Sequence, residues 1–195
     1  MVNSSNLPHT RASLADEFST LGLAAGQTVI VHSSMKQIGG WIIGGAQTVI
    51  EALLDVLGME GTLMMPTHTT SNTEPSRWQS PPIPPEWWQI MRETTPPFDP
   101  AITPTRLMGA LAEQFRTYPG VVRSQHPVGS FAAKGRYAAY LTANHDYRRD
   151  MFGDESPIGK LYQLDGCVML LGVGHGNDTS LHLAEYRANW GGKVD

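Results

Sequence analysis

The chain has 195 residues, a formal net charge of −4 and 41% hydrophobic residues, which suit one domain with a single core. Charged residues make up only 16% and form no basic run, which argues against a nucleic-acid partner. The single cysteine, Cys167, excludes an internal disulfide framework and fits a reducing compartment. Since we find no membrane-length apolar stretch and no signal-peptide core, we expect a cytoplasmic protein.

Predicted helices and strands alternate along the first third of the chain. Thr10 caps a predicted helix over residues 10–22, and a β-branched strand covers 28–31. A helix is expected from about 46 to 57, followed by a strand over 62–65. This alternation indicates an α/β fold.

A long proline-rich segment, 66–104, comes next and carries three tryptophans. A loop of that length is more often functional or disordered, and the tryptophans argue against disorder. Beyond it we expect a helix over 105–117, a short strand at 128–133, a helix at 137–143 and a buried strand at 166–173.

A glycine-rich loop follows the first strand. Backbone N–H groups, hydroxyls and the start of the next helix can bind phosphate together. The loop has neither a Walker ending nor a G-x-G-x-x-G pattern, and an ordinary glycine-rich connection is an equally good interpretation. Its candidate binding residues are His32, Ser33, Ser34, Lys36, Ile38, Gly39 and Gly40.

A second polar cluster surrounds Arg123. Its guanidinium could contact a phosphate, and Ser130, which precedes Phe131, could bond a ligand carbonyl or amide. From these residues alone, a surface salt bridge and a strand-edge serine are the better interpretation.

The third candidate is a helix start late in the chain. Asp178, Thr179 and Ser180 are good N-cap residues, so a helix should begin between 178 and 180. His182 would then lie in the first turn, with Glu185 three residues on along the same face. A carboxylate can orient the ring and stabilise its protonated form, as a general base requires. From spacing alone, a packed histidine with an exposed glutamate is the more frequent arrangement.

Other catalytic chemistries find little support. The seven histidines form no helical H-x-x-x-H pair and no H-x-H, so we expect no metal site and interpret His68 and His175 as isolated. A serine hydrolase would need a G-x-S-x-G turn, which is absent from the sequence. Cys167 lies in the predicted buried strand, where a thiol is inert.

Together these pieces resemble the aminoglycoside 3-N-acetyltransferase family. The match covers nearly the whole chain, and its first and last motifs border the glycine loop and the late helix. In chain order the matching landmarks are His32-Ser33-Ser34, Gly61 to Pro66, Phe98-Asp99-Pro100, Thr103-Pro104-Thr105, Met108-Gly109, Arg123-Ser124-x-His126-Pro127, Ser130-Phe131, Ser156 to Leu161 and Thr179-Ser180-x-His182-x-x-Glu185.

The resemblance implies an α/β fold with a layered mixed sheet and flanking helices, of the antibiotic N-acetyltransferase type and not the common N-acetyltransferase fold. It implies acetyl-coenzyme A as donor and the 3-amino group of a 2-deoxystreptamine aminoglycoside as acceptor, which confers antibiotic resistance. We further expect no metal, no membrane partner, and a monomer or homodimer. The alternatives are an acetyltransferase for another small amine and a non-catalytic coenzyme A-binding protein.

The resemblance also implies roles for individual residues. His182 would be the general base, Glu185 its supporting carboxylate, and Thr179 a hydroxyl near the thioester. Coenzyme A would lie along 32–45. Arg123, Ser130 and Phe131 would assist in holding it.

The acceptor would lie near Glu74, Trp78 and Asp99, because acidic and aromatic groups suit a polycation. Family members continue for a substantial stretch beyond the Glu185 helix. We therefore expect residues 1–195 to be a single domain of this family without its C-terminal part.

Overall fold

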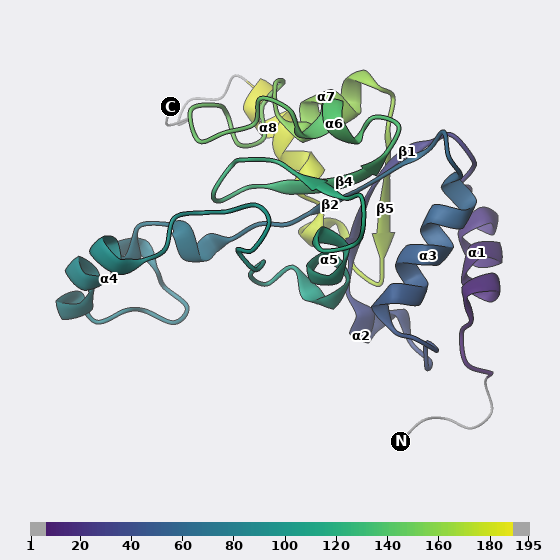
Figure 1. Ribbon diagram of the computed structural model, residues 1–195, viewed down its shortest axis with the longest axis horizontal. Helices are drawn as coiled ribbons and strands as arrows, with labels where there is room; N and C mark the ends of the chain where they lie inside the picture. The colour runs from purple at the N-terminus through teal and green to yellow at the C-terminus, as the bar shows by residue number, and fades with distance from the viewer. Residues whose placement is uncertain (1–6, 189–195) are drawn as a thin grey trace.

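The computed structural model describes residues 7–188, which form one five-stranded mixed sheet between two groups of helices (Figure 1). The strand order is β3-β4-β2-β1-β5, which confirms the predicted α/β class. The strands are β1 Thr28–Ser33, β2 Thr62–Pro66, β3 Val122–Arg123, β4 Phe131–Gly135 and β5 Cys167–Leu171. The α-helices are α1 Arg11–Thr20, α2 Met35–Ile38, α3 Ala46–Leu57, α4 Trp88–Thr94, α5 Gly109–Arg116, α6 Ala138–Thr142, α7 Pro157–Gln163 and α8 His182–Arg187.

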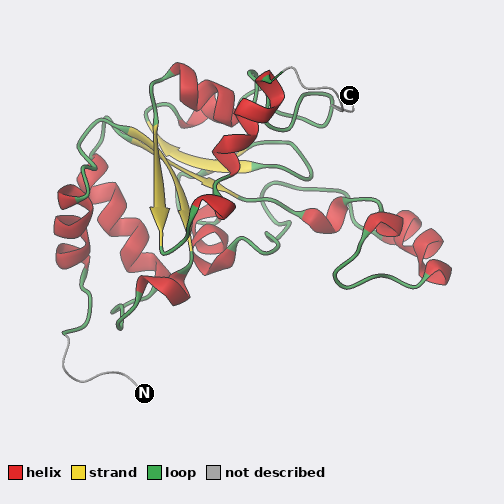
Figure 2. Cartoon of the chain, turned by 180° about the vertical axis from the view of Figure 1, so that it is seen from behind, coloured by secondary structure: helices red, strands yellow, loops and turns green. Residues whose placement is uncertain are grey.

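Helices cover both faces of the sheet (Figure 2). Successive residues of a strand point to opposite faces, so Val29 and Val31 pack with residues of α1, α3 and α5. Ile30 lies on the other face, in a cluster with residues of α6, α7 and α8. Burial on both faces explains why β1 is a continuous apolar run in the sequence.

The first two long helices lie where the sequence predicts them. Thr10 caps α1, since its hydroxyl accepts from the Ser13 N–H at 3.1 Å in a reciprocal capping box. The helix α3 begins at Ala46 and ends at Leu57, in agreement with the prediction. Within residues 7–188, no helix has both the length and the apolar character needed to cross a bilayer.

The helix expected over 105–117 begins later, at Gly109. Leu107 and Gly109 have φ values of 62° and 82°, so a continuous α-helix cannot run through residues 105–109. The Arg106 N–H instead donates to the His68 carbonyl at 2.9 Å. A contact distant in sequence therefore overrides the local helical pattern.

The strand predicted as buried, 166–173, is an edge strand. β5 pairs with β1 on one side only, and among the described residues no strand pairs with its other side. Cys167 and Val168 are exposed, the latter at 41%. The prediction that Cys167 is buried is therefore wrong, because an apolar run does not reveal whether a strand is central or at an edge.

Residues 66–104 form an arm that extends away from the sheet (Figure 1). It is not a structureless loop, since it contains three 3₁₀ turns and α4. Its tryptophans hold it together: Trp78 Nε1 donates to the Thr73 hydroxyl at 2.8 Å, and Trp88 Nε1 donates to the Ile83 carbonyl at 3.1 Å. The prediction of an ordered segment is confirmed.

Candidate active site

The candidate site lies at one edge of the sheet. Strands β1, β2 and β5 run parallel, so their carboxyl ends meet there. Ser33 is in register with Leu171, and the Ser34 N–H donates to the Leu171 carbonyl at 3.0 Å. The glycine loop after β1 and the segment that leads to His182 therefore leave the sheet side by side. Crevices outside the carboxyl ends of parallel strands are the usual ligand sites of α/β folds.

The His182–Glu185 pair forms as predicted. Asp178 caps the segment by accepting from the Ser180 N–H at 2.9 Å, and a 3₁₀ turn over Thr179–Leu181 leads into α8. Nδ1 of His182 lies 2.6 Å from Oε2 of Glu185. The two side chains are 46% and 64% exposed, so the pair faces the surface.

Phe152 sets the plane of the His182 ring. The two rings stack with centroids 4.9 Å apart and an interplanar angle of 15°. Glu185 occupies Nδ1, and no side chain in the described part of the molecule bonds Nε2 of His182. The free nitrogen is therefore Nε2. The His182 ring is fixed by Phe152 stacked on one face and by Glu185 at Nδ1, an arrangement that suits a general base.

Further histidines gather behind this pair. His68 packs edge-on against Phe131 with centroids 5.2 Å apart and tilts against Phe152 at 5.6 Å. Burial and, to a smaller extent, the neighbouring histidines lower the pKa of His68 to about 3. The interpretation of His68 as isolated is wrong, because strands far apart in sequence bring these rings together. Within residues 7–188, no cluster of histidine, cysteine and acidic residues has an arrangement that could hold a metal ion.

The glycine loop carries hydroxyl and ammonium groups that could meet a ligand. Ser34 starts α2 without a side-chain cap bond, and Lys36 is exposed. Gly40 has φ of 64°, and a Cβ there would lie 2.9 Å from Nε2 of His9. A hollow of about 570 Å³ adjoins the loop, lined by Leu7, Pro8, His9, Ser13, Glu17, Ile38, Gly39 and Gly40. The missing side chain at Gly40 thus lets His9 lie close to the predicted phosphate-binding stretch.

Arg123 is buried and its donors point inward. The guanidinium donates to the carbonyls of Thr67 and Thr103, both at 2.6 Å, and lies over the Phe98 ring at 5.0 Å. Burial lowers its pKa to about 10. Arg123 therefore joins the two ends of the arm, a role that differs from the predicted phosphate contact.

Ser130 and Phe131 are fully buried. The Ser130 hydroxyl donates to the Thr67 carbonyl at 2.8 Å, and Phe131 lies in the core beside His68. Side chains without exposed surface can act on a ligand only through their neighbours. We therefore assign them a supporting position behind the site, in place of the predicted direct contact.

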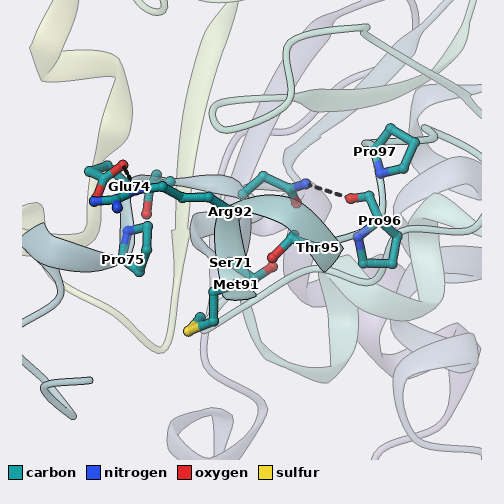
Figure 3. Close-up of a pocket in the computed structure, with 10 residues that line it drawn as sticks. Ser71, Glu74, Pro75, Met91, Arg92, Thr95, Pro96 and Pro97 are labelled. Atoms are coloured by element: carbon teal, nitrogen blue, oxygen red, sulfur yellow. Dashed lines mark hydrogen bonds and ion pairs between the residues drawn. The ribbon is translucent and has the colours of Figure 1, made fainter. Parts of the chain in front are cut away.

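The predicted acceptor residues do not converge. Glu74 and Trp78 lie on the arm and Asp99 at its return, where the Asp99 carboxylate accepts from the Ala101 N–H at 2.8 Å. Glu74 is paired with Arg92, Oε1 to Nη2, at 2.5 Å, and this contact lowers the pKa of Glu74 to about 2. The two side chains turn toward each other in a pocket of about 330 Å³ (Figure 3).

Sequence reasoning missed two features of the site. Phe152 stacks on His182 from a segment with no periodic pattern, so no local signal identifies it. Asp178 is recognisable as a helix cap, but its contact with His32 at 3.5 Å joins residues 146 positions apart and has no signature in the sequence.

The model for a family described as aminoglycoside 3-N-acetyltransferase matches residues 30–194. The SPbeta prophage-derived aminoglycoside N(3')-acetyltransferase-like protein YokD of Bacillus subtilis (strain 168) is 44% identical over 188 residues, which are 96% of this chain and 68% of YokD. The crystal structure of YokD matches with a TM-score of 0.93 at 43% identity, covering 97% of this chain and 70% of that one.

Two further solved structures carry ligands. AAC-IIIb, in a binary complex with CoASH, matches with a TM-score of 0.81 at 36% identity, covering 94% of this chain and 66% of its own. AAC-VIa bound to sisomicin matches with a TM-score of 0.80 at 30% identity, covering 92% and 65%. The chain thus spans about two thirds of the length of these relatives. With the family model matching most of the sequence, the chain belongs to the aminoglycoside 3-N-acetyltransferase family.

Proposed function

We propose that this protein transfers an acetyl group from acetyl-coenzyme A to the 3-amino group of a 2-deoxystreptamine aminoglycoside. The observation that carries the proposal is the 2.6 Å contact between Nδ1 of His182 and Glu185, which leaves Nε2 free beside the carboxyl ends of the parallel strands. Family membership supports the reaction type. The relatives solved with CoASH and with sisomicin support the classes of donor and acceptor.

The proposed reaction is a direct attack of the amine on the thioester. Nε2 of His182 takes a proton from the amine as its nitrogen bonds to the carbonyl carbon, and Glu185 stabilises the protonated ring. The Thr179 hydroxyl or a backbone N–H would donate to the oxyanion of the tetrahedral intermediate. The C–S bond then breaks, and the coenzyme A sulfur leaves as a thiolate that takes up a proton. General-base assistance of this kind contributes about 10²–10⁴-fold to the rate.

The donor is proposed to lie along the loop that begins at His32. Exposed N–H groups, the Ser33 and Ser34 hydroxyls and the Lys36 ammonium would meet the phosphates. The hollow beside Gly39 and Gly40 gives the loop open space on one side. No metal is needed, because a thioester is already activated for acyl transfer.

The acceptor is proposed to lie between His182 and the arm. Asp99 and Trp78 remain the candidates for contact with ammonium and sugar groups. Glu74 is already neutralised by Arg92, so it would contact a cationic ligand only after that pair opens. We therefore rank Asp99 ahead of Glu74, whose position suits a structural contact within the arm.

A thiol-release assay with acetyl-coenzyme A and a panel of aminoglycosides, including sisomicin, tests the proposed function. We expect turnover in the wild-type protein and a loss of at least about 10²-fold in His182→Ala, since the base is removed. Donor affinity, measured by calorimetry, should change little. His175→Ala is the matched control, because this exposed histidine lies in the same segment and has no role in the proposed reaction.

Each outcome assigns the protein differently. Coenzyme A binding without turnover on any amine would identify a non-catalytic binding protein. Turnover on a small amine but on no aminoglycoside would move the acceptor to another class. Near-normal turnover in His182→Ala would remove this histidine from the chemistry.

A further inference from the structure

His32 ends β1 facing the segment that carries His182. Its Nε2 lies 3.5 Å from Oδ1 of Asp178, and the two side chains are only 3% and 7% exposed. Nε2 is buried and has no hydrogen-bond partner within ordinary geometry among the described residues. Buried polar atoms are almost always bonded, so the position of this nitrogen beside a carboxylate calls for an explanation.

Asp178 fixes the start of the helix that carries the base. Its Oδ1 accepts from both the N–H and the hydroxyl of Ser180, at 2.9 and 2.5 Å. The helix α8 spans only six residues, and a helix that short depends on anchors outside itself. Downstream anchors are the buried Leu183 and the Arg187–Asp154 ion pair at 2.6 Å. Asp178 is the anchor upstream of His182.

We propose that His32 is a positioning residue for His182: its Nε2 lies 3.5 Å from the Asp178 carboxylate, and this contact ties the start of the His182 helix to the end of β1. The inference rests on the proposed function for its kinetic consequence. Its structural part concerns the segment 178–182 and is measurable without any substrate.

The environment of His32 suits a neutral donor. Burial lowers the pKa of His32, although the Asp178 carboxylate opposes the shift. A neutral imidazole carries one N–H, and the carboxylate favours the tautomer with that hydrogen on Nε2. β1 lies between β2 and β5 in the sheet, and His32 itself is in register with Leu170 of β5.

A positioning role makes predictions that differ from those of the proposed cofactor contact. A residue that binds coenzyme A changes the KM for acetyl-coenzyme A. A residue that places the general base changes kcat, because a displacement of about 1 Å can cost about 10²-fold in rate. The two roles separate in steady-state kinetics.

The test uses His32→Leu, His32→Gln, Asp178→Ala and the double variant His32→Leu with Asp178→Ala. We expect His32→Leu to lower kcat by about 10- to 100-fold with little change in the KM for acetyl-coenzyme A. His32→Gln should recover most of the rate, since its amide places a donor near the Nε2 position. The double variant should be no slower than Asp178→Ala, because both changes remove the same contact.

Asp146→Ala is the matched control, because the Asp146 carboxylate accepts from the Arg148 N–H at 2.9 Å in the same local geometry, away from His182 in the sequence. It should leave kcat unchanged. Hydrogen exchange of the Ser180 amide should be faster in both His32→Leu and Asp178→Ala than in the wild type.

An unchanged Ser180 exchange rate in His32→Leu overturns the inference, whether or not the protein acetylates any amine. A change confined to the KM for acetyl-coenzyme A, or a double variant with additive losses, overturns it as well. If His32→Leu does not fold, the inference is judged from the Ser180 exchange rate and the kcat of Asp178→Ala and His32→Gln. Absence of turnover in the wild type instead contradicts the proposed function alone.

Discussion

Glu185 illustrates how much a single exposed carboxylate can do. Its contact with Nδ1 of His182 is short at 2.6 Å, yet the carboxylate is 64% exposed, so water screens the pair and it contributes little to stability. In the proposed mechanism, Glu185 orients the ring and stabilises its protonated form during proton transfer.

Glu185→Gln should therefore lower kcat by about tenfold or more, because the amide keeps the shape but loses the charge. The KM for acetyl-coenzyme A and the thermal unfolding midpoint should remain close to the wild-type values. Steady-state kinetics and calorimetry check both. A variant with unchanged kcat would show that His182 works without a carboxylate partner.

Among the structural elements, the arm over residues 66–104 depends on a buried cation. Arg123 bonds the Thr67 carbonyl where the arm leaves the sheet and the Thr103 carbonyl where it returns. No other residue type presents several donors in one plane to acceptors on two segments.

Arg123→Leu should destabilise the protein by about 3 kcal/mol, since it removes the charged hydrogen bonds to the Thr67 and Thr103 carbonyls. It should also raise the KM for the acceptor more than the KM for acetyl-coenzyme A, because the contacts that join the two ends of the arm are lost. Arg136→Leu is the control: Arg136 is exposed and pairs with Glu60 at 2.6 Å on the surface. Chemical denaturation and two-substrate kinetics measure both effects, and equal stability losses in the two variants would contradict the assignment.

At the scale of the whole molecule, the buried histidines make the folded protein less stable as the pH falls. Burial is the main cause that lowers the pKa of His68 to about 3 and that of His145 to about 4, and it also lowers the pKa values of His32 and His126. In the unfolded chain each titrates near its usual value of about 6.5. The unfolded state therefore binds protons first as the pH falls.

The free energy of unfolding should be unaffected by these groups above about pH 6.5 and should decrease as the pH falls toward about 4. A histidine that stays neutral in the folded protein costs about 2 kcal/mol of stability at pH 5. His68→Leu should weaken the decrease between pH 7 and pH 5, because His68 makes no hydrogen bond through Nε2 that the variant would lose. Unfolding midpoints across this pH range measure it, and an unchanged slope would contradict the prediction.

The sequence by itself determined the local features. Capping at Thr10, the apolar runs of β1 and β2, and the His182–Glu185 spacing follow from rules that act within a few residues, so they were predictable. The motifs shared with the family extended that local reading to the reaction class.

Tertiary structure decided what depends on distant neighbours. The edge position of β5 exposes Cys167, and the two ends of the arm engage Arg123, which the sequence associated with phosphate. The sheet also brings His32 to Asp178 and Phe152 to His182. Burial and side-chain contact arise only when strands pair and helices pack, and they decide whether a polar residue meets a ligand or holds the residue that does.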